Sequence, residues 1–236
     1  MSVLLKATGL GKTFGGVTAA RDVSIGIDEK QIICVIGANG AGKSTLFNML
    51  CGALRPDEGQ VIFDGQSLVG LSLHQFARKG IARKFQVPSV FGSLSVRQNL
   101  ELSCRDRGKA RTLKARTNDM LERIELRRLQ NDQAGLLAHG QKQWLEIGMA
   151  LMSSPRLLLL DEPTAGMTPE ETKKTADLIL SMSNETAVMA IEHDMGFVRA
   201  LGCHTYVMHQ GEIIVEGNFK DVESNALVRD VYLGKA

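Results

Sequence analysis

Two kinds of apolar pattern alternate along this chain. Continuous apolar runs at residues 32–36, 157–160 and 186–191 have the length and composition of strands buried on both faces of a parallel sheet. Residues 95–135 are instead rich in Arg, Lys and Glu, and their apolar residues, among them Leu113 and Met120, recur at helical spacing. The chain is therefore predicted to fold as an α/β protein with a helical insertion.

Turn and capping signals divide the rest of the chain into short elements. The further predicted strands are residues 3–8 and 21–28 around a Gly15-Gly16 turn, then 61–63, 81–85 and a hairpin over 206–215. Capping boxes predict helices that begin at Ser72, Ser95 and Thr168. Asp194 is the predicted N-cap of a helix that Gly202 ends.

The composition is that of an ordinary globular protein and excludes several classes. The chain has 236 residues and a formal net charge of +2, so it lacks the basic excess of a protein whose main partner is nucleic acid. No apolar run approaches the length that crosses a bilayer, and the first residues lack the apolar core of a secretion signal. We therefore expect a soluble, intracellular chain whose membrane role, if any, is peripheral and through a partner.

The cysteines are predicted to be free thiols. Cys34, Cys51, Cys104 and Cys203 are scattered without a C-x-x-C pair, and Cys34 lies in a predicted core strand. Buried free thiols are typical of a reducing cytosol, which agrees with the expected location.

A glycine-rich loop follows the first apolar run and leads into a predicted helix. Its sequence fits the phosphate-loop pattern G-x-x-x-x-G-K-[ST] without a mismatch, which predicts binding of a nucleoside triphosphate. The glycines are expected to take positive φ and to bring amides close to phosphate oxygens, while Lys43 supplies an ammonium and Ser44 a hydroxyl for Mg²⁺. The predicted triphosphate-binding residues are Gly37, Asn39, Gly40, Ala41, Gly42, Lys43, Ser44 and Thr45.

Acidic residues end the second apolar run. Asp161 and Glu162 follow four leucines, and open α/β sheets bind ligands at the carboxyl ends of their strands. Asp161 is predicted to hold Mg²⁺ opposite Ser44, and Glu162 to accept a proton from, or orient, the water that attacks the γ-phosphate. The alternative is an Asp-Glu pair in a surface turn.

His193 ends the third apolar run at the same predicted edge of the sheet. A neutral imidazole there can hydrogen-bond a γ-phosphate oxygen or orient the attacking water. His193 is therefore a third candidate for the hydrolytic site.

Several other residues keep two interpretations at this level. Phe14, in the Gly15-Gly16 turn, either stacks on an adenine or is packed, and Gln86 is either solvated or part of the site. The turn at 137–141 precedes a helix and is a weak anion site. The arginines of the insertion either form a solvated face or contact acidic lipid or nucleic acid: Arg105, Arg107, Arg111 and Arg116.

The order of these motifs resembles that of the ATP-binding subunit of ABC transporters over essentially the whole chain. The matching segments are Phe14 (the adenine-stacking aromatic), 37–45 (Walker A), Gln86 (the Q-loop), 137–141 (the signature), 157–162 (Walker B), 165–168 (the D-loop) and His193 (the switch histidine). The resemblance implies an α/β P-loop NTPase fold, with a RecA-like parallel sheet and an antiparallel β edge. It also implies a single ABC ATPase domain, with a nucleotide-binding core of residues 1–88 and 156–236 and a helical subdomain of residues 89–155.

The resemblance further implies how the site is assembled. Two subunits, identical or different, would form a head-to-tail dimer with ATP between the Walker motifs of one and the signature of the other: Ala138, His139, Gly140 and Gln141. The implied catalytic residues are Lys43, Gln86, Glu162 and His193, and the implied Mg²⁺ ligands are Ser44, Gln86 and Asp161. Transmembrane permease subunits and, indirectly, a solute-binding protein are the implied partners, at the cytoplasmic side of the inner membrane.

Two departures from the family pattern bear on turnover. The signature usually reads Leu-Ser-Gly-Gly-Gln, whereas Ala138 here replaces the serine and His139 a glycine. Thr168 replaces the D-loop aspartate. Neither departure touches Lys43 or Glu162, so hydrolysis is still expected.

A narrower resemblance is to the ATPases of urea and branched-chain amino-acid importers, the urea type being closer. It rests on residues 137–149, 165–171 and 231–234. The competing hypotheses are a soluble ABC ATPase acting on DNA or ribosomes and a regulatory nucleotide-binding module without turnover. The first commonly carries long coiled coils or two ATP sites in one chain, neither of which this sequence has, and the retained Glu162 argues against the second.

Overall fold

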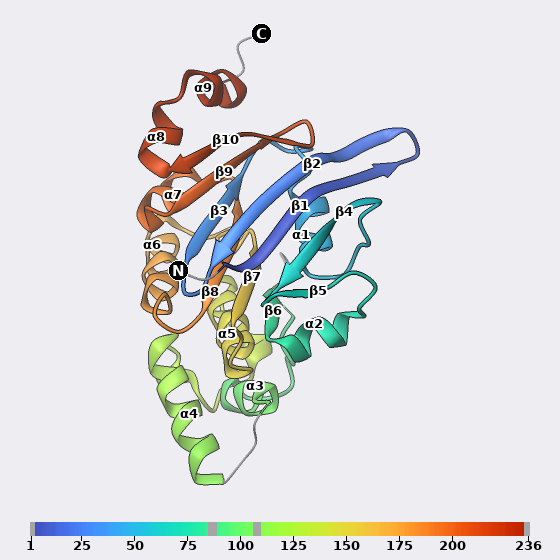
Figure 1. Cartoon of the computed structure of the whole chain (residues 1–236). Coiled ribbons are helices and arrows are strands. Elements are labelled where there is room, and N and C mark those ends of the chain that lie inside the picture. Colours follow the sequence, from blue (N-terminus) through green and yellow to red (C-terminus); the bar gives the residue numbers. More distant parts are fainter. Residues whose placement is uncertain (1–2, 85–88, 106–109, 234–236) are drawn as a thin grey trace.

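Two β-sheets and their flanking helices form the protein, seen in a computed structural model that describes residues 3–84, 89–105 and 110–233 (Figure 1). The larger sheet has the strand order β10-β9-β3-β8-β7-β6. Its strands are β3 (Ile32–Ile36), β6 (Ile81–Lys84), β7 (Leu157–Asp161), β8 (Ala187–Glu192), β9 (His204–His209) and β10 (Glu212–Asn218). All neighbouring pairs are parallel except β9 and β10, which are antiparallel. The predicted parallel sheet with an antiparallel edge is confirmed.

The three apolar runs of the sequence are the three central strands of this sheet. Every residue of β3 and β8 is buried, as are the four leucines of β7. Their side chains alternate between two cores: Leu158 and Leu160 lie in one, Leu157 and Leu159 in the other. A strand that is buried on both faces has no polar face, which explains why its sequence is continuously apolar.

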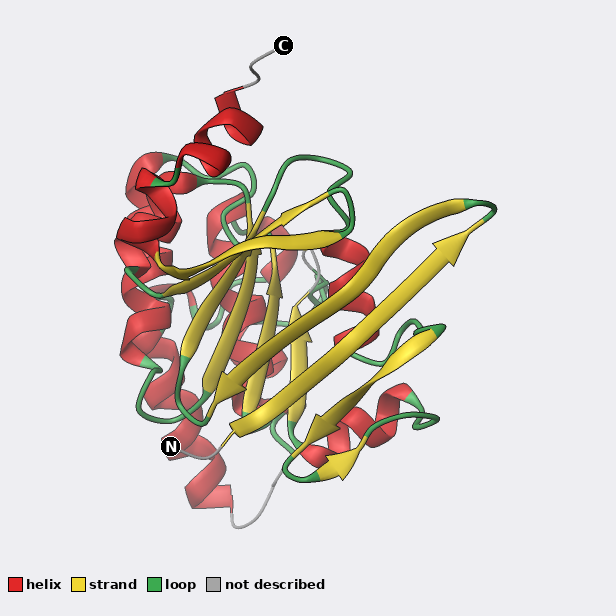
Figure 2. Ribbon diagram, turned by 45° about the horizontal axis from the view of Figure 1, so that its top comes forward, coloured by secondary structure: helices red, strands yellow, loops and turns green. Residues whose placement is uncertain are grey.

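A second, antiparallel sheet has the order β2-β1-β4-β5 and lies across one face of the parallel sheet (Figure 2). Its strands are β1 (Val3–Phe14), β2 (Val17–Asp28), β4 (Glu58–Phe63) and β5 (Gln66–Ser67). The strands predicted at 3–8 and 21–28 are thus longer than expected, because their pairing continues to Phe14 and Val17 across several register shifts. Such irregularities break the alternation of polar and apolar residues on which a sequence-based boundary depends.

Helices pack on the other face of the parallel sheet, and those of the insertion extend beyond the end of the sheet (Figure 1). Those of the insertion are α3 (Val96–Ser103), α4 (Ala110–Arg123), η1 (Arg127–Leu129), η2 (Ala134–Leu136) and α5 (His139–Met152). They are followed by α6 (Pro169–Ser181), α7 (Met195–Leu201), α8 (Phe219–Ser224) and α9 (Ala226–Leu233). On the opposite face, α1 (Lys43–Leu50) and α2 (Leu73–Lys79) pack with the antiparallel sheet.

Local hydrogen bonds explain where several of these helices begin. The Ser95 hydroxyl accepts a bond from the Gln98 amide, and the Thr168 hydroxyl accepts one from the Glu171 amide. The Asp194 carboxylate accepts bonds from the first amides of α7, which Gly202 ends in a left-handed conformation. These predicted caps are confirmed.

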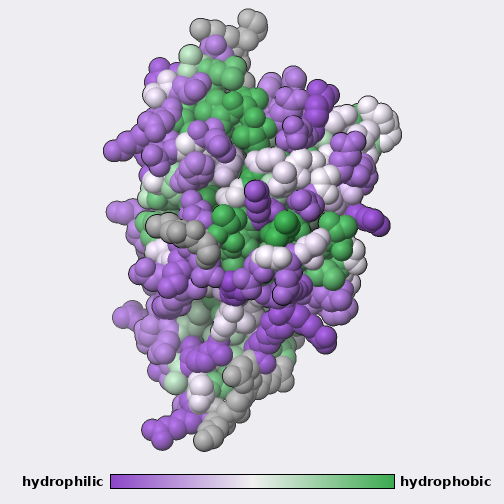
Figure 3. All heavy atoms as spheres, viewed as in Figure 1, coloured by the Kyte–Doolittle hydropathy of each residue, from purple (hydrophilic) through white to green (hydrophobic). Residues whose placement is uncertain are grey.

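The surface is mixed in character. Figure 3 shows hydrophilic and apolar residues interspersed on one face, with apolar ones gathered over α9 and β10. None of the helices that the structure describes is long and apolar enough to cross a membrane.

Two of the predicted surface arginines bond within the chain: Arg105 donates to the Ala77 carbonyl and Arg116 to the Met152 carbonyl. Arg107 lies outside the described residues. The four cysteines are free, as predicted.

Candidate nucleotide-binding site

The phosphate loop lies between β3 and α1. Gly40 and Gly42 take φ values of 80° and 103°, as expected. Gly37 does not take a positive φ, so that expectation is wrong for this residue. The need for glycine there is spatial, because a Cβ on Gly37 would lie 2.3 Å from the Met208 carbonyl oxygen of β9. The backbone of the loop at Gly37 therefore packs directly against β9, and this contact fixes its position.

The Lys43 ammonium is enclosed by this loop. Its Nζ donates to the carbonyl oxygens of Gly37, at 2.7 Å, and Ala38, at 3.0 Å. Burial lowers the pKa of Lys43, and nearby carboxylates, first that of Glu162, oppose the shift. The ammonium thus lies in the electrostatic field of the acidic residues that end β7 and β8.

Other residues of the loop differ in their exposure to solvent. Asn39, Gly40 and Ser44 are exposed, Thr45 is half-buried and Ala41 is buried under the loop. The exposed residues Asn39, Gly40 and Ser44 lie at the N-terminus of α1, where the helix dipole favours an anion.

Asp161 ends β7, and Glu162 follows it beside His193, which comes directly after β8. The Glu162 Oε1 and the His193 Nδ1 lie 3.4 Å apart. Glu162 takes a φ of 44°, an unfavourable conformation for a residue with a Cβ, and its amide donates to the Ile191 carbonyl at 2.9 Å. Burial, and then the neighbouring carboxylate of Glu162, raise the pKa of Asp161. Strained backbone of this kind persists where the surrounding structure holds it, which is common in active sites.

Two buried charged groups near this site were not predicted from the sequence. Lys84, at the end of β6, is fully buried, and its Nζ lies 3.8 Å from the Oε2 of Glu146 on α5. Burial lowers the pKa of Lys84 and raises that of Glu146. In the sequence, Lys84 is visible only as a lysine near the end of a short predicted strand, and a lysine in such a place is more often exposed to solvent than buried. Gln86, just beyond Lys84, lies outside the described residues, so its predicted role stays a prediction.

Lys84→Met is expected to lower the free energy of unfolding by about 3 kcal/mol, because it leaves the Glu146 carboxylate buried without its cation. The double variant Lys84→Met/Glu146→Leu should recover most of this loss, since two apolar side chains of similar volume need no charge partner. Denaturant unfolding of the three proteins measures both effects. A double variant no more stable than Lys84→Met would show that the ion pair is not the source of the loss.

Glu192, the last residue of β8, is the third buried charge that the sequence did not single out. It is fully buried and accepts hydrogen bonds from the Thr164 amide and hydroxyl. Its position at the end of an apolar strand, one residue before His193, was the available signal.

The signature residues at the start of α5 contact the segment after β7. The Gln141 Oε1 accepts a bond from the Ala138 amide at 3.0 Å, while Ala138 itself has no side-chain oxygen to cap the helix. The His139 Nε2 donates to the Ala165 carbonyl at 2.9 Å. A Cβ on Gly140 would lie 2.4 Å from the Glu171 Oε1. Within one chain, these residues therefore contact the D-loop and α6 rather than the phosphate loop.

Phe14 lies at the tip of the β1–β2 hairpin. Its side chain is 48% exposed, so the ring is not packed in the core. The Lys12 ammonium lies 5.6 Å from the ring centroid and is held by Asp57 at 2.6 Å. An exposed ring of this kind is available for stacking on a base.

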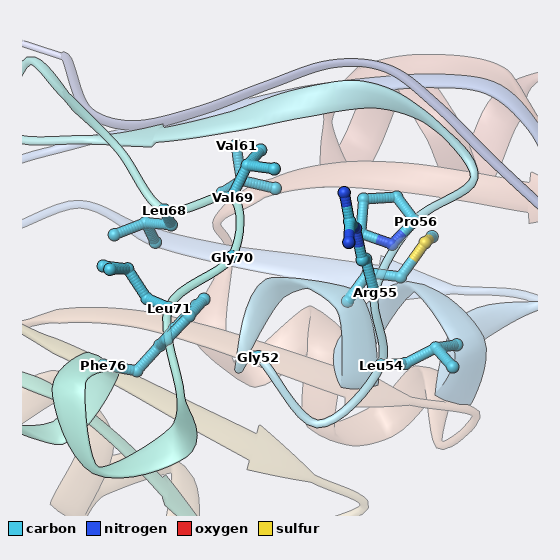
Figure 4. A pocket seen from close by; sticks show the side chains of 11 residues that line it. Gly52, Leu54, Arg55, Pro56, Val61, Leu68, Val69, Gly70, Leu71 and Phe76 are labelled. Carbon is cyan, nitrogen blue, oxygen red and sulfur yellow. The ribbon is translucent and has the colours of Figure 1, made fainter.

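An apolar pocket of about 260 Å³ lies elsewhere, between the end of α1, β4 and α2. Leu68, Leu71 and Phe76 line it (Figure 4). It contains none of the residues predicted to bind ATP or Mg²⁺. The residues predicted to bind the nucleotide therefore lie apart from this pocket.

Comparisons with known proteins agree with this arrangement. The sequence pattern described as "ABC transporter" matches residues 20–165. The high-affinity branched-chain amino acid transport ATP-binding protein BraF of Pseudomonas aeruginosa is 36% identical over 99% of this chain and 98% of its own length. LivG of Escherichia coli is 35% identical over the same shares. The crystal structure of the ADP conformation of MJ1267, an ATP-binding cassette of an ABC transporter, has a TM-score of 0.88 and 30% identity over the whole of both chains.

A phosphate loop between a parallel strand and a helix, facing acidic residues at the ends of the adjacent strands, defines a P-loop nucleoside triphosphatase. The chain belongs to the ABC transporter family. It is the ATP-binding and ATP-hydrolysing domain of that family.

Proposed function

We propose that this chain hydrolyses Mg²⁺-ATP to energise an importer, taking up a small polar solute through partner permeases. The observation that carries the proposal is the buried Lys43 ammonium, which lies in the field of Glu162, Asp161 and Glu192. Glu162 in turn faces His193 across 3.4 Å. This arrangement joins a phosphate-binding group to a candidate general base and its partner, which is what hydrolysis requires and mere binding does not.

The donor set at the site suits Mg²⁺. The Ser44 hydroxyl and the Asp161 carboxylate are hard oxygen donors, and Gln86 is the third proposed ligand. The described part of the chain holds no cluster of three or more His, Cys, Asp or Glu that would bind a metal alone. This agrees with a Mg²⁺ ion bound mostly by phosphates and waters, which neutralises charge on the β- and γ-phosphates when bound.

The residues of this chain have separable proposed roles in the reaction. The loop amides from Gly37 to Thr45 and the Lys43 ammonium bind the phosphates, and Phe14 stacks on the adenine. Glu162 accepts a proton from the attacking water. His193 holds the γ-phosphate or the attacking water in place. Gln86 and its loop face the transmembrane permease subunit and act as the sensor of that partner.

We propose a homodimer or heterodimer in which each signature, from Ala138 to Gln141, covers the partner's ATP. The open phosphate loop supports this proposal, because one chain leaves Asn39, Gly40 and Ser44 exposed. The proposed subdomains are a core of residues 1–88 and 156–236 and a helical part of residues 89–155. The assembly would sit peripherally on the cytoplasmic side of the inner membrane, with permeases and indirectly a solute-binding protein as partners and no nucleic acid.

Urea is the proposed solute, on the resemblance of residues 137–149 and 165–171 to urea-importer ATPases. Branched-chain amino acids are the alternative, and the names of BraF and LivG favour them. The test is to purify the chain with its membrane subunits, reconstitute them in liposomes, and measure phosphate release with each solute and its binding protein. We expect urea to stimulate phosphate release. Stimulation by leucine alone would favour branched-chain amino acids as the solute instead of urea. No ATP hydrolysis with either solute would refute the transport function.

A further inference from the structure

The Glu192 carboxylate joins the segment after Glu162 to the segment that carries His193. Its Oε1 accepts bonds from the Thr164 amide at 3.0 Å and the Thr164 hydroxyl at 2.7 Å. Its Oε2 accepts bonds from the amides of His193 at 3.1 Å and Asp194 at 3.5 Å. One carboxylate thus ties two loops that come from different strands, β7 and β8.

A buried carboxylate is costly unless it is hydrogen-bonded on both oxygens. Burial raises the pKa of Glu192, and the four donors, first the Thr164 hydroxyl, oppose that shift. An apolar residue at the end of β8 would fill this space without the cost of desolvating a charge. The four hydrogen bonds to its carboxylate explain how a charged side chain can be buried at this position.

The two tied segments carry the pair that the reaction uses. Thr164 follows Glu162 by two residues, and His193 is bonded to Glu192 directly through its amide. The Glu162 amide is also held by β8, through the Ile191 carbonyl at 2.9 Å. The left-handed backbone of Glu162 therefore depends on contacts made by the last two residues of β8.

We propose that Glu192 is a positioning residue that sets the geometry of Glu162 relative to His193. The inference rests on the proposed roles of these two residues in hydrolysis. Glu192 does not touch the nucleotide in this scheme; it holds both loops so that the Glu162 carboxylate and the His193 imidazole stay next to each other, at 3.4 Å.

The test is steady-state ATP hydrolysis by Glu192→Gln in the full chain with its partner subunits. A glutamine keeps one acceptor oxygen and turns an amide NH₂ toward the donors on the other side, so one of the two loops is released. We expect kcat to fall between about 10-fold and 100-fold, the scale of a small misplacement of reacting groups, with KM for ATP changed less than about threefold. Glu216→Gln, on the exposed face of β10, is the matched control and should leave kcat unchanged.

A second measurement separates positioning from general loss of structure. In a His193→Ala background, Glu192→Gln should lower kcat much less than it does alone, because the pair that it positions is already broken. A loss of the same size in both backgrounds, or an unchanged kcat for Glu192→Gln, would overturn the inference.

Thr164→Val covers the case in which Glu192→Gln fails to fold. It removes the hydroxyl donor and keeps the carboxylate and its three amide donors, and it should lower kcat by about threefold or more at unchanged KM. Normal kcat in this variant would overturn the inference. Wild-type protein without any phosphate release would instead refute the proposed function itself.

Discussion

Glu162→Gln is expected to lower ATP turnover by about 10²-fold to 10⁴-fold, the contribution of a general base, while ATP affinity stays close to that of the wild type. The amide keeps the size of the carboxylate but cannot accept the proton of the attacking water. Lys43 and the phosphate loop are untouched, so binding is retained. A dimer with ATP held between its subunits should accumulate, because closure no longer ends in hydrolysis.

Phosphate release and size-exclusion chromatography with ATP measure the two effects of Glu162→Gln. The matched control is Glu170→Gln, an exposed glutamate in the first turn of α6. Turnover close to the wild type would show that another group serves as the base. His193, whose Nδ1 lies 3.4 Å from Glu162, would then be the first candidate.

Lys43→Ala is expected to weaken ATP binding by about 100-fold or more, equivalent to about 3 kcal/mol. The ammonium is the one cation that the loop encloses with its own carbonyls, at 2.7 Å and 3.0 Å. Its loss removes charge-assisted bonds to phosphate, which are stronger than neutral ones. It also removes one of the cations that offset the carboxylates near the loop, so their repulsion of the phosphates would increase.

Isothermal titration with ATP measures this loss, and circular dichroism shows whether Lys43→Ala is folded. Lys6→Ala, an exposed lysine of β1, is the control for removing a positive charge. A folded Lys43→Ala protein with wild-type affinity would refute the role of the loop. Together the two variants separate binding from chemistry, since Glu162→Gln should bind ATP and Lys43→Ala should not.

Much of the fold is predictable from the sequence because its signals are local. The phosphate loop at residues 37–45 can be recognised from its own sequence and from the strand and helix on either side. The caps at Ser95, Thr168 and Asp194 depend on residues within one helical turn. The strands that are buried on both faces are visible as continuous apolar runs, because such a strand has no solvent-exposed face that would carry polar residues.

The boundaries of β1 and β2 and the reason for Gly37 could not be predicted in the same way. The two strands extend to the Gly15-Gly16 turn because their pairing resumes after each register shift and continues to Phe14 and Val17. Gly37 is required by the Met208 carbonyl of β9, a strand far along the chain. Both depend on which segment lies alongside, and nothing in the local sequence carries that information.

The buried charges depend on the folded chain for the same reason. Glu192 and Thr164 are 28 residues apart in sequence, and Lys84 meets Glu146 only where β6 lies against α5. A glutamate or lysine is normally exposed, so its burial follows from partners that satisfy it. The sheet order β10-β9-β3-β8-β7-β6 places β8 between the strand that carries the phosphate loop and the strand that carries the acidic residues. Strand order is a property of packing between distant segments, and it alone brings Glu162 and His193 together beside Lys43.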